Sequence, residues 1–185
     1  MPALKRAFEI NEREPAEAVP LLEYLAESGS PMGMIFLGYA YRAGTGVVKD
    51  PAQAERWYRR AADMGSVLGL YELGRLYIEQ VRYDEAKEAF RFASAAGYAP
   101  ATYHLGRMYW FGFGVEKDIR RAKTLWEDAS ANGHVFAERH LATLFIQTRL
   151  NTAEWLWGIF LIGRSFVGLF TALCSEGFGS DRLRY

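Results

Sequence analysis

Nearly the same run of sequence occurs twice in this chain. Residues 46–65 read "GVVKDPAQAERWYRRAADMG", and residues 114–133 read "GVEKDIRRAKTLWEDASANG". A glycine also closes an alanine-rich segment four times, at steps of 36, 32 and 36 residues. Internal similarity at such a period predicts stacked copies of one small unit rather than a single globular core. The closing glycines are Gly29, Gly65, Gly97 and Gly133.

A Leu-Gly pair marks the first half of each unit. It occurs at Leu37-Gly38, Leu73-Gly74 and Leu105-Gly106, and weakens to Leu141-Ala142 in the fourth copy. The surrounding pattern predicts a helix over roughly 32–43 in the first full unit. Glycine costs a helix about 1 kcal/mol relative to alanine. Its recurrence therefore indicates that another helix packs closely against the backbone there.

The second half of each unit has the signals of a capped amphipathic helix. Asp50 is a suitable N-cap and Pro51 a suitable first-turn residue, which predicts a helix over 51–63. Gly65 then ends it, as a glycine after a helix commonly does. The expected apolar stripe comprises Ala54, Trp57, Tyr58, Ala61 and Ala62.

The units differ in length at one loop. Two of them carry a glycine loop, "AGTGVVKD" or "FGFGVEKD", whereas the unit between them has the shorter "EQVR". We therefore expect the following organisation: residues 1–30 as an N-terminal cap and partial repeat, 31–66 as a repeat, 67–98 as a loop-deleted repeat, 99–134 as a repeat, 135–150 as a half repeat, 151–175 as a hydrophobic, transmembrane-length helix, and 176–185 as a tail.

Two stretches carry a resemblance to a known family. "LGYAYRAGTGVVKDPAQAERWYRRAADMG" and "LGRMYWFGFGVEKDIRRAKTLWEDASANG" resemble Sel-1-like repeats, relatives of the tetratricopeptide repeat, and the resemblance covers residues 14–146. It implies an all-α fold, a right-handed α-solenoid of stacked helix-turn-helix repeats. It also implies a scaffold or adaptor that binds other proteins and is not an enzyme.

The glycine loops do not have the context of a phosphate-binding loop. Such a loop follows a strand and has a fuller motif spacing, whereas here a helix is expected before it and no Lys-Ser or Lys-Thr pair follows. We expect the glycines instead to allow positive φ between antiparallel helices. They are Gly44, Gly46, Gly112 and Gly114.

Composition points away from catalysis, cofactors and nucleic acid. Basic and acidic residues number 22 each, so there is no basic footprint for nucleic acid. The three histidines, His104, His134 and His140, lack a closed set of metal ligands, and no nucleophile has a base beside it. The single Cys174 cannot form an internal disulfide. We expect no catalytic residue, metal, cofactor or small-molecule substrate.

The resemblance also suggests which residues face a partner. In the family's geometry the first helices line the concave surface, and the candidate set is rich in tyrosine and arginine, which are enriched at interaction hot spots. Arginines there would favour a peptide that carries carboxylates or a free C-terminus. The alternative is that these are ordinary amphipathic residues. The set is Tyr39, Arg42, Tyr71, Arg75, Tyr103, Arg107, Trp110 and Arg139.

The C-terminal region contains an apolar segment, residues 155–174, whose one charge is Arg164. Twenty helical residues span about 30 Å, the thickness of a bilayer's hydrocarbon core. A seam of small residues also suits close helix packing in a membrane. The alternative is a helix buried against protein. The residues expected to contact the membrane or a partner helix are Trp155, Trp157, Gly158, Arg164, Ser165, Gly168 and Ala172.

Together these patterns predict a scaffold that binds a partner protein in the groove of its repeats. The N-terminus lacks the apolar region of a signal peptide, so we expect the repeats in the cytoplasm, anchored to a membrane by the C-terminal helix. The alternative is a soluble subunit whose apolar helix packs into a partner enzyme or a homodimer.

Overall fold

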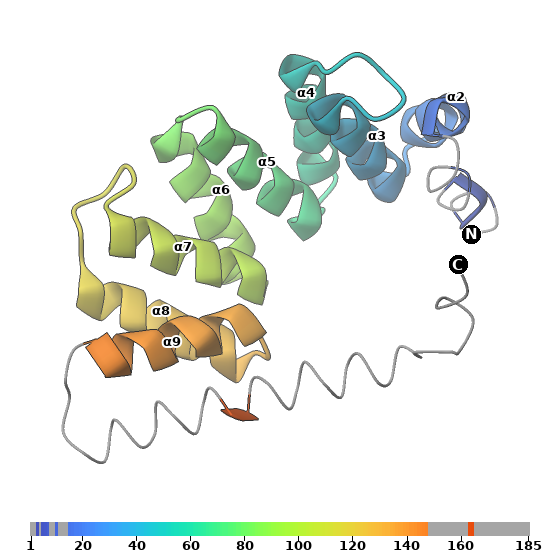
Figure 1. The fold of residues 1–185 in the computed structure, drawn as a ribbon. Helices are drawn as coiled ribbons and strands as arrows, with labels where there is room; N and C mark the ends of the chain where they lie inside the picture. The colour runs from blue at the N-terminus through green and yellow to red at the C-terminus, as the bar shows by residue number, and fades with distance from the viewer. Residues whose placement is uncertain (1–2, 4, 8–9, 11–14, 148–162, 165–185) are drawn as a thin grey trace, which may run out of the picture. The chain divides into compact units, whose positions relative to one another are not determined.

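The computed structural model describes residues 3, 5–7, 10, 15–147 and 163–164 (Figure 1). Across these residues the regular secondary structure is helical, and no strand is present among them. The chain divides into two compact units, Met1–Ala101 and Thr102–Tyr185. The all-helical prediction is confirmed for the described residues.

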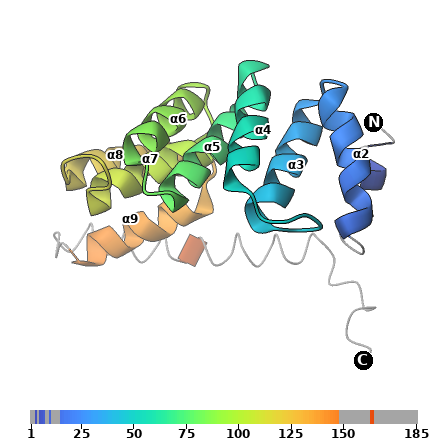
Figure 2. The same cartoon turned by 90° about the horizontal axis from the view of Figure 1, so that it is seen from above.

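The first unit is a series of helix hairpins, in which each helix packs against the next and successive first helices also touch (Figure 1, Figure 2). Ahead of them, residues 3, 5–7 and 10 are helical and Ala7 is fully buried. The helices are α2 (Pro15–Glu27), α3 (Pro31–Ala43), α4 (Pro51–Asp63), α5 (Val67–Glu79) and α6 (Tyr83–Ala95).

The second unit continues the same alternation. It takes in most of α7 (Ala99–Phe111), then α8 (Ile119–Ala131) and α9 (Val135–Gln147), with α8 packed on α9 (Figure 1). The expected helix over 151–175 lies outside the described residues except for Gly163 and Arg164, which are helical.

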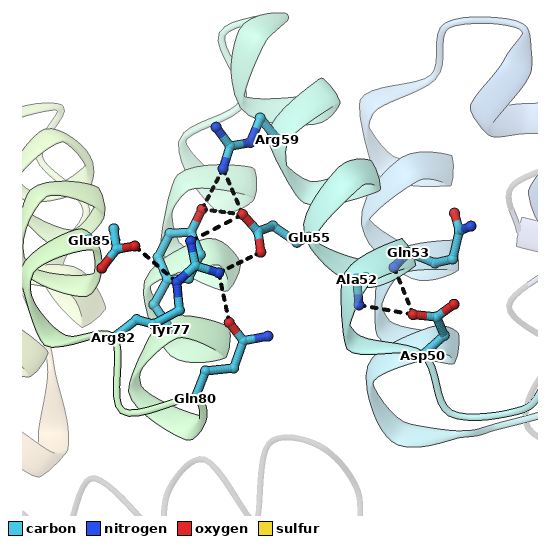
Figure 3. Close-up of polar contacts among 9 residues, drawn as sticks. All are labelled: Asp50, Ala52, Gln53, Glu55, Arg59, Tyr77, Gln80, Arg82 and Glu85. Carbon is cyan, nitrogen blue, oxygen red and sulfur yellow. Dashed lines mark hydrogen bonds and ion pairs between the residues drawn. The ribbon is translucent and has the colours of Figure 1, made fainter.

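The local signals in the sequence act as expected. The Asp50 carboxylate accepts hydrogen bonds from the backbone N–H groups of Ala52 and Gln53, at 3.0 and 3.1 Å, and caps α4 (Figure 3). Asp118 caps α8 in the same way, through the N–H of Arg121 at 2.9 Å. The glycine loops do turn at positive φ, with values of 75°, 75°, 78° and 63° at Gly44, Gly46, Gly112 and Gly114.

The Leu-Gly glycines lie directly beneath aromatic rings of the following helix. A Cβ added to Gly38 would lie 2.6 Å from Cε1 of Tyr58, and one added to Gly74 would lie 2.6 Å from Cε1 of Phe90. Gly106 is covered in the same way by Trp126. All three rings are 0% exposed. The predicted close packing is therefore confirmed, and it is an aromatic ring that requires each glycine.

The loop-deleted repeat, residues 67–98, makes the turn between its two helices differently. Val81 replaces glycine at positive φ, 62°, and the neighbouring Arg82 reaches back to α4, where it donates to Glu55 at 2.7 Å (Figure 3). The Tyr77 hydroxyl and Arg59 also donate to Glu55, at 3.0 and 2.6 Å. Burial alone would raise the pKa of Glu55, but these hydrogen bonds hold it below its usual range.

We expect Gly74→Ala to lower the free energy of unfolding by about 1–3 kcal/mol, because the methyl group overpacks against Phe90. Helix propensity alone would give a gain of about 1 kcal/mol. Urea denaturation followed by circular dichroism measures the change. In a Phe90→Leu background the methyl finds space, so the same substitution should cost less there. An equal cost in both backgrounds would show that the ring is not what excludes a side chain.

Candidate functional site

In the first unit, the two predicted partner-binding arginines already have carboxylate partners. Arg42 is only 7% exposed and bonds Glu79 at 3.2 Å and Glu72 at 3.6 Å, both on α5. Arg75 bonds Glu72 at 3.2 Å. Arg42 and Arg75 are therefore neutralised within the unit, and Arg42 tethers α3 to α5 rather than lying open to solvent.

The predicted tyrosines of this unit differ in exposure. Tyr39 on α3 is 45% exposed, with the Arg42 guanidinium 5.4 Å from its ring centre. Tyr71 on α5 is half-buried, edge-on to Tyr98 at 5.1 Å between ring centres. Burial raises the pKa of Tyr71. Tyr39 thus offers more contact area to a partner than Tyr71 does.

The second unit gathers aromatic and imidazole rings on α7 and α9. Tyr103 stacks on His134 with ring centres 4.5 Å apart, and His140 stacks on the buried Trp126 at 4.8 Å. Beside these rings lies a shallow depression of about 170 Å³, lined by Phe136, Arg139, His140 and Thr143. Within the described part of the chain, no three His, Cys, Asp or Glu side chains come together as a metal site.

The two predicted partner-binding arginines of the second unit, Arg107 and Arg139, have no carboxylate partner among the described residues. Arg107 lies over Phe111 and Arg139 over Phe136, each with its guanidinium 5.9 Å from the ring centre. Both lie near enough to His140 to affect its titration. Trp110 is half-buried, packed 5.4 Å from Trp126. The four predicted arginines therefore fall into two different electrostatic environments.

Sequence reasoning grouped the arginines together and missed what separates them. The repeat periods of 32 and 36 residues place His104 and His140 at the position that Glu72 occupies in the first unit. They likewise place Phe111 at the position of Glu79. Aligning the repeats would have revealed this difference, because the positions of the acidic partners Glu72 and Glu79 hold histidine or phenylalanine in the second unit.

Of the residues predicted to contact a membrane or partner helix, the structure describes only Arg164. It donates to Glu138 of α9 at 2.6 Å, and the Glu138 side chain is 8% exposed. No helix within the described ranges has the length and apolar character that crossing a bilayer requires. The other predicted contacts lie outside the described residues: Trp155, Trp157, Gly158, Ser165, Gly168 and Ala172.

We expect acid to weaken the fold through the two histidines of this cluster. Burial lowers the pKa of His134 and of His140, and Arg107 and Arg139 lower that of His140 further. The unfolded chain, with histidine pKa near 6.5, then takes up protons before the folded chain does. The free energy of unfolding should therefore fall between pH 7 and pH 5, as measured by urea denaturation at each pH.

Glu55 does not contribute to this slope, because its hydrogen bonds hold its pKa below the usual range of a glutamate. Replacing both histidines, His134→Gln with His140→Gln, should flatten the pH dependence between pH 7 and pH 5. If the double variant keeps the slope of the parent protein, other groups cause it.

Comparison with known proteins agrees with the helical pairs. The family model described as Sel1 repeat matches residues 31–66 and 99–134. A component of an ERAD-associated E3 ubiquitin-protein ligase, HRD3B of Arabidopsis thaliana, is 33% identical over 119 residues, which are 64% of this chain and 19% of that protein. Chitin synthase regulatory factor 1 of Schizosaccharomyces pombe is 30% identical over 57% of this chain and 25% of its own length.

Solved structures share the fold. A Sel1 repeat protein from Oxalobacter formigenes superposes with a TM-score of 0.76 at 24% identity, covering 88% of this chain and 71% of that one. A protective antigen of uropathogenic Escherichia coli with an SLR fold gives a TM-score of 0.68 at 29% identity, covering 83% and 34%. Sel1 repeat proteins generally act as scaffolds for protein interaction. This chain therefore carries Sel1 repeats at residues 31–66 and 99–134, in a series of helix hairpins like those of solved Sel1 repeat proteins.

Proposed function

We propose that this protein is an adaptor that holds a partner protein on the first helices of its repeats. The observation that carries this is the placement of exposed or half-buried tyrosine and arginine side chains on α3, α5, α7 and α9, at repeating positions. Large side chains with a polar end contribute much of the energy of protein interfaces. The buried Arg42 is given a structural role, because it tethers α3 to α5. The proposed contact set keeps Tyr39, Tyr71, Arg75, Tyr103, Arg107, Trp110 and Arg139.

The names of two relatives agree with a non-catalytic role. One is called a component of a ubiquitin ligase and the other a regulatory factor of chitin synthase, so each is named as an accessory to an enzyme. This chain spans only a fifth to a quarter of their lengths. What it shares with them is the repeat region, and recruitment by that region would raise the local concentration of a bound partner.

Site-specific photo-cross-linking tests the proposed face. A photoreactive phenylalanine analogue in place of Tyr39 or Tyr103 should cross-link the full chain to a defined partner in cells that produce it. Phe92 on α6, 53% exposed, is the matched control position because it is an exposed aromatic on a second helix. We expect cross-links from the two tyrosine positions and few from Phe92. Equal yields from all three positions would contradict the proposed face.

For the C-terminal segment, the Glu138–Arg164 pair favours the alternative of packing against protein over membrane anchoring. Glu138 is nearly buried, and an unpaired buried carboxylate is costly. The repeat register places Glu138 where Met34 and Thr102 are buried in earlier copies. An arginine from the apolar segment gives this carboxylate a partner, so we propose that the segment covers the last repeat.

A double-mutant cycle of Glu138→Gln and Arg164→Gln distinguishes packing of the C-terminal segment against the last repeat from anchoring in a membrane. If the segment covers the last repeat, the coupling energy should be about 1 kcal/mol, kept modest because Arg164 is 58% exposed. Urea denaturation of the full chain in a non-ionic detergent measures it. Arg121→Gln paired with Glu138→Gln should show no coupling. Zero coupling for Arg164, with the protein pelleting with membranes, would support the anchor instead.

A further inference from the structure

We infer that the α7–α9 face of the second unit binds a carboxylate-rich segment of a partner protein, between Arg107 and Arg139. This inference rests on the proposed adaptor function and names the chemistry of its ligand. The predicted arginines of the first unit do not supply such a site, because Arg42 and Arg75 already bond Glu72 and Glu79.

The repeat register shows how the site arises. Arg107 occupies the same repeat position as Arg75, and in the first unit Arg75 is neutralised by Glu72, three residues before it. In the second unit the residue three before Arg107 is His104. The acidic partner is thus replaced while the cation is kept. An arginine that lacks an internal carboxylate is suited to bind one from another molecule.

Arg139 adds a second cation to the same face. It lies over Phe136, whose ring centre is 6.4 Å from that of Tyr103, and Tyr103 in turn lies 5.5 Å from His140. Arg107 is one helical turn after Tyr103 on α7, so both cations are close to the same group of rings. Within the described residues of this unit, the carboxylate nearest in sequence to Arg139 is Glu138, which is buried and bonded to Arg164. The face therefore has two positive charges that are not balanced by the described residues.

The surrounding rings make the site more than a pair of surface charges. Phe136, which is 56% exposed, and Arg139 border the depression, with His140 and Thr143 completing its lining. Aromatic surface next to a charged hydrogen bond excludes water and strengthens it. Two arginines beside apolar rings fit a peptide with acidic residues flanked by hydrophobic ones.

The test is binding of fluorescein-labelled hexaglutamate to the full chain, measured by fluorescence anisotropy in a non-ionic detergent. Equally labelled hexaglutamine is the neutral control peptide. We expect hexaglutamate to bind at least tenfold more tightly than hexaglutamine. Equal affinities for the two peptides would overturn the inference.

Two variants locate the site. Arg139→Gln removes one cation, and His104→Glu restores beside Arg107 the carboxylate that Glu72 provides beside Arg75. Each should weaken hexaglutamate binding about tenfold, the value of one charge-assisted hydrogen bond. Arg120→Gln on the exposed side of α8 removes the same charge from the same unit and should leave binding unchanged. Equal losses in all three variants would indicate attraction to net charge and overturn the site.

A site-specific signal comes from His140. Bound carboxylates would offset the two arginines, so the pKa of His140, followed by its imidazole Cε1–H resonance, should rise when hexaglutamate saturates the protein. An unchanged titration would contradict binding at this face. If hexaglutamate fails to bind while the cross-links from Tyr39 and Tyr103 persist, the adaptor function stands and only this inference fails. If both fail, the adaptor function fails too.

Discussion

The architecture depends on the contact between a helical glycine and the aromatic ring that covers it. At Gly38, Gly74 and Gly106 the absence of a side chain lets the second helix of the hairpin approach the backbone of the first. The ring above each glycine is then completely buried. This contact joins the two helices of one hairpin, and the packing of α5 on both α3 and α4 joins that hairpin to the next.

The sequence was most informative where the determinants are local. Asp50 caps the helix that follows it, and the loop glycines turn at positive φ, because these preferences depend on residues within one turn. The ion pairs between helices could not be predicted from such local preferences. Arg82 and Glu55 are 27 residues apart and Arg42 and Glu79 are 37 apart, so their pairing depends on how neighbouring helices are placed.

For the candidate site, the positions of the residues could be predicted from the sequence, but their burial and ion pairing could not. The repeat register identified which first-helix positions carry tyrosine and arginine. It did not reveal that Arg42 is buried against two carboxylates, because burial is decided by the adjacent hairpin. Repeats with nearly the same fold thus differ in how their polar faces are used. In the first unit Arg42 and Arg75 pair with carboxylates of α5, whereas in the second Arg107 and Arg139 have no carboxylate partner among the described residues.

The two kinds of turn within the repeats also have a consequence for how this scaffold changes length. In the glycine loops, the N–H of Asp50 bonds Tyr41 O at 2.8 Å and that of Asp118 bonds Tyr109 O at 2.9 Å, so each loop is closed at its base. Extra residues at the tip leave that closure untouched. The turn at Val81 has no spare segment, and Arg82 beside it is committed to Glu55. Grafted epitopes or whole inserted domains therefore belong in the glycine loops, whereas an insertion at the Val81 turn would split the hairpin.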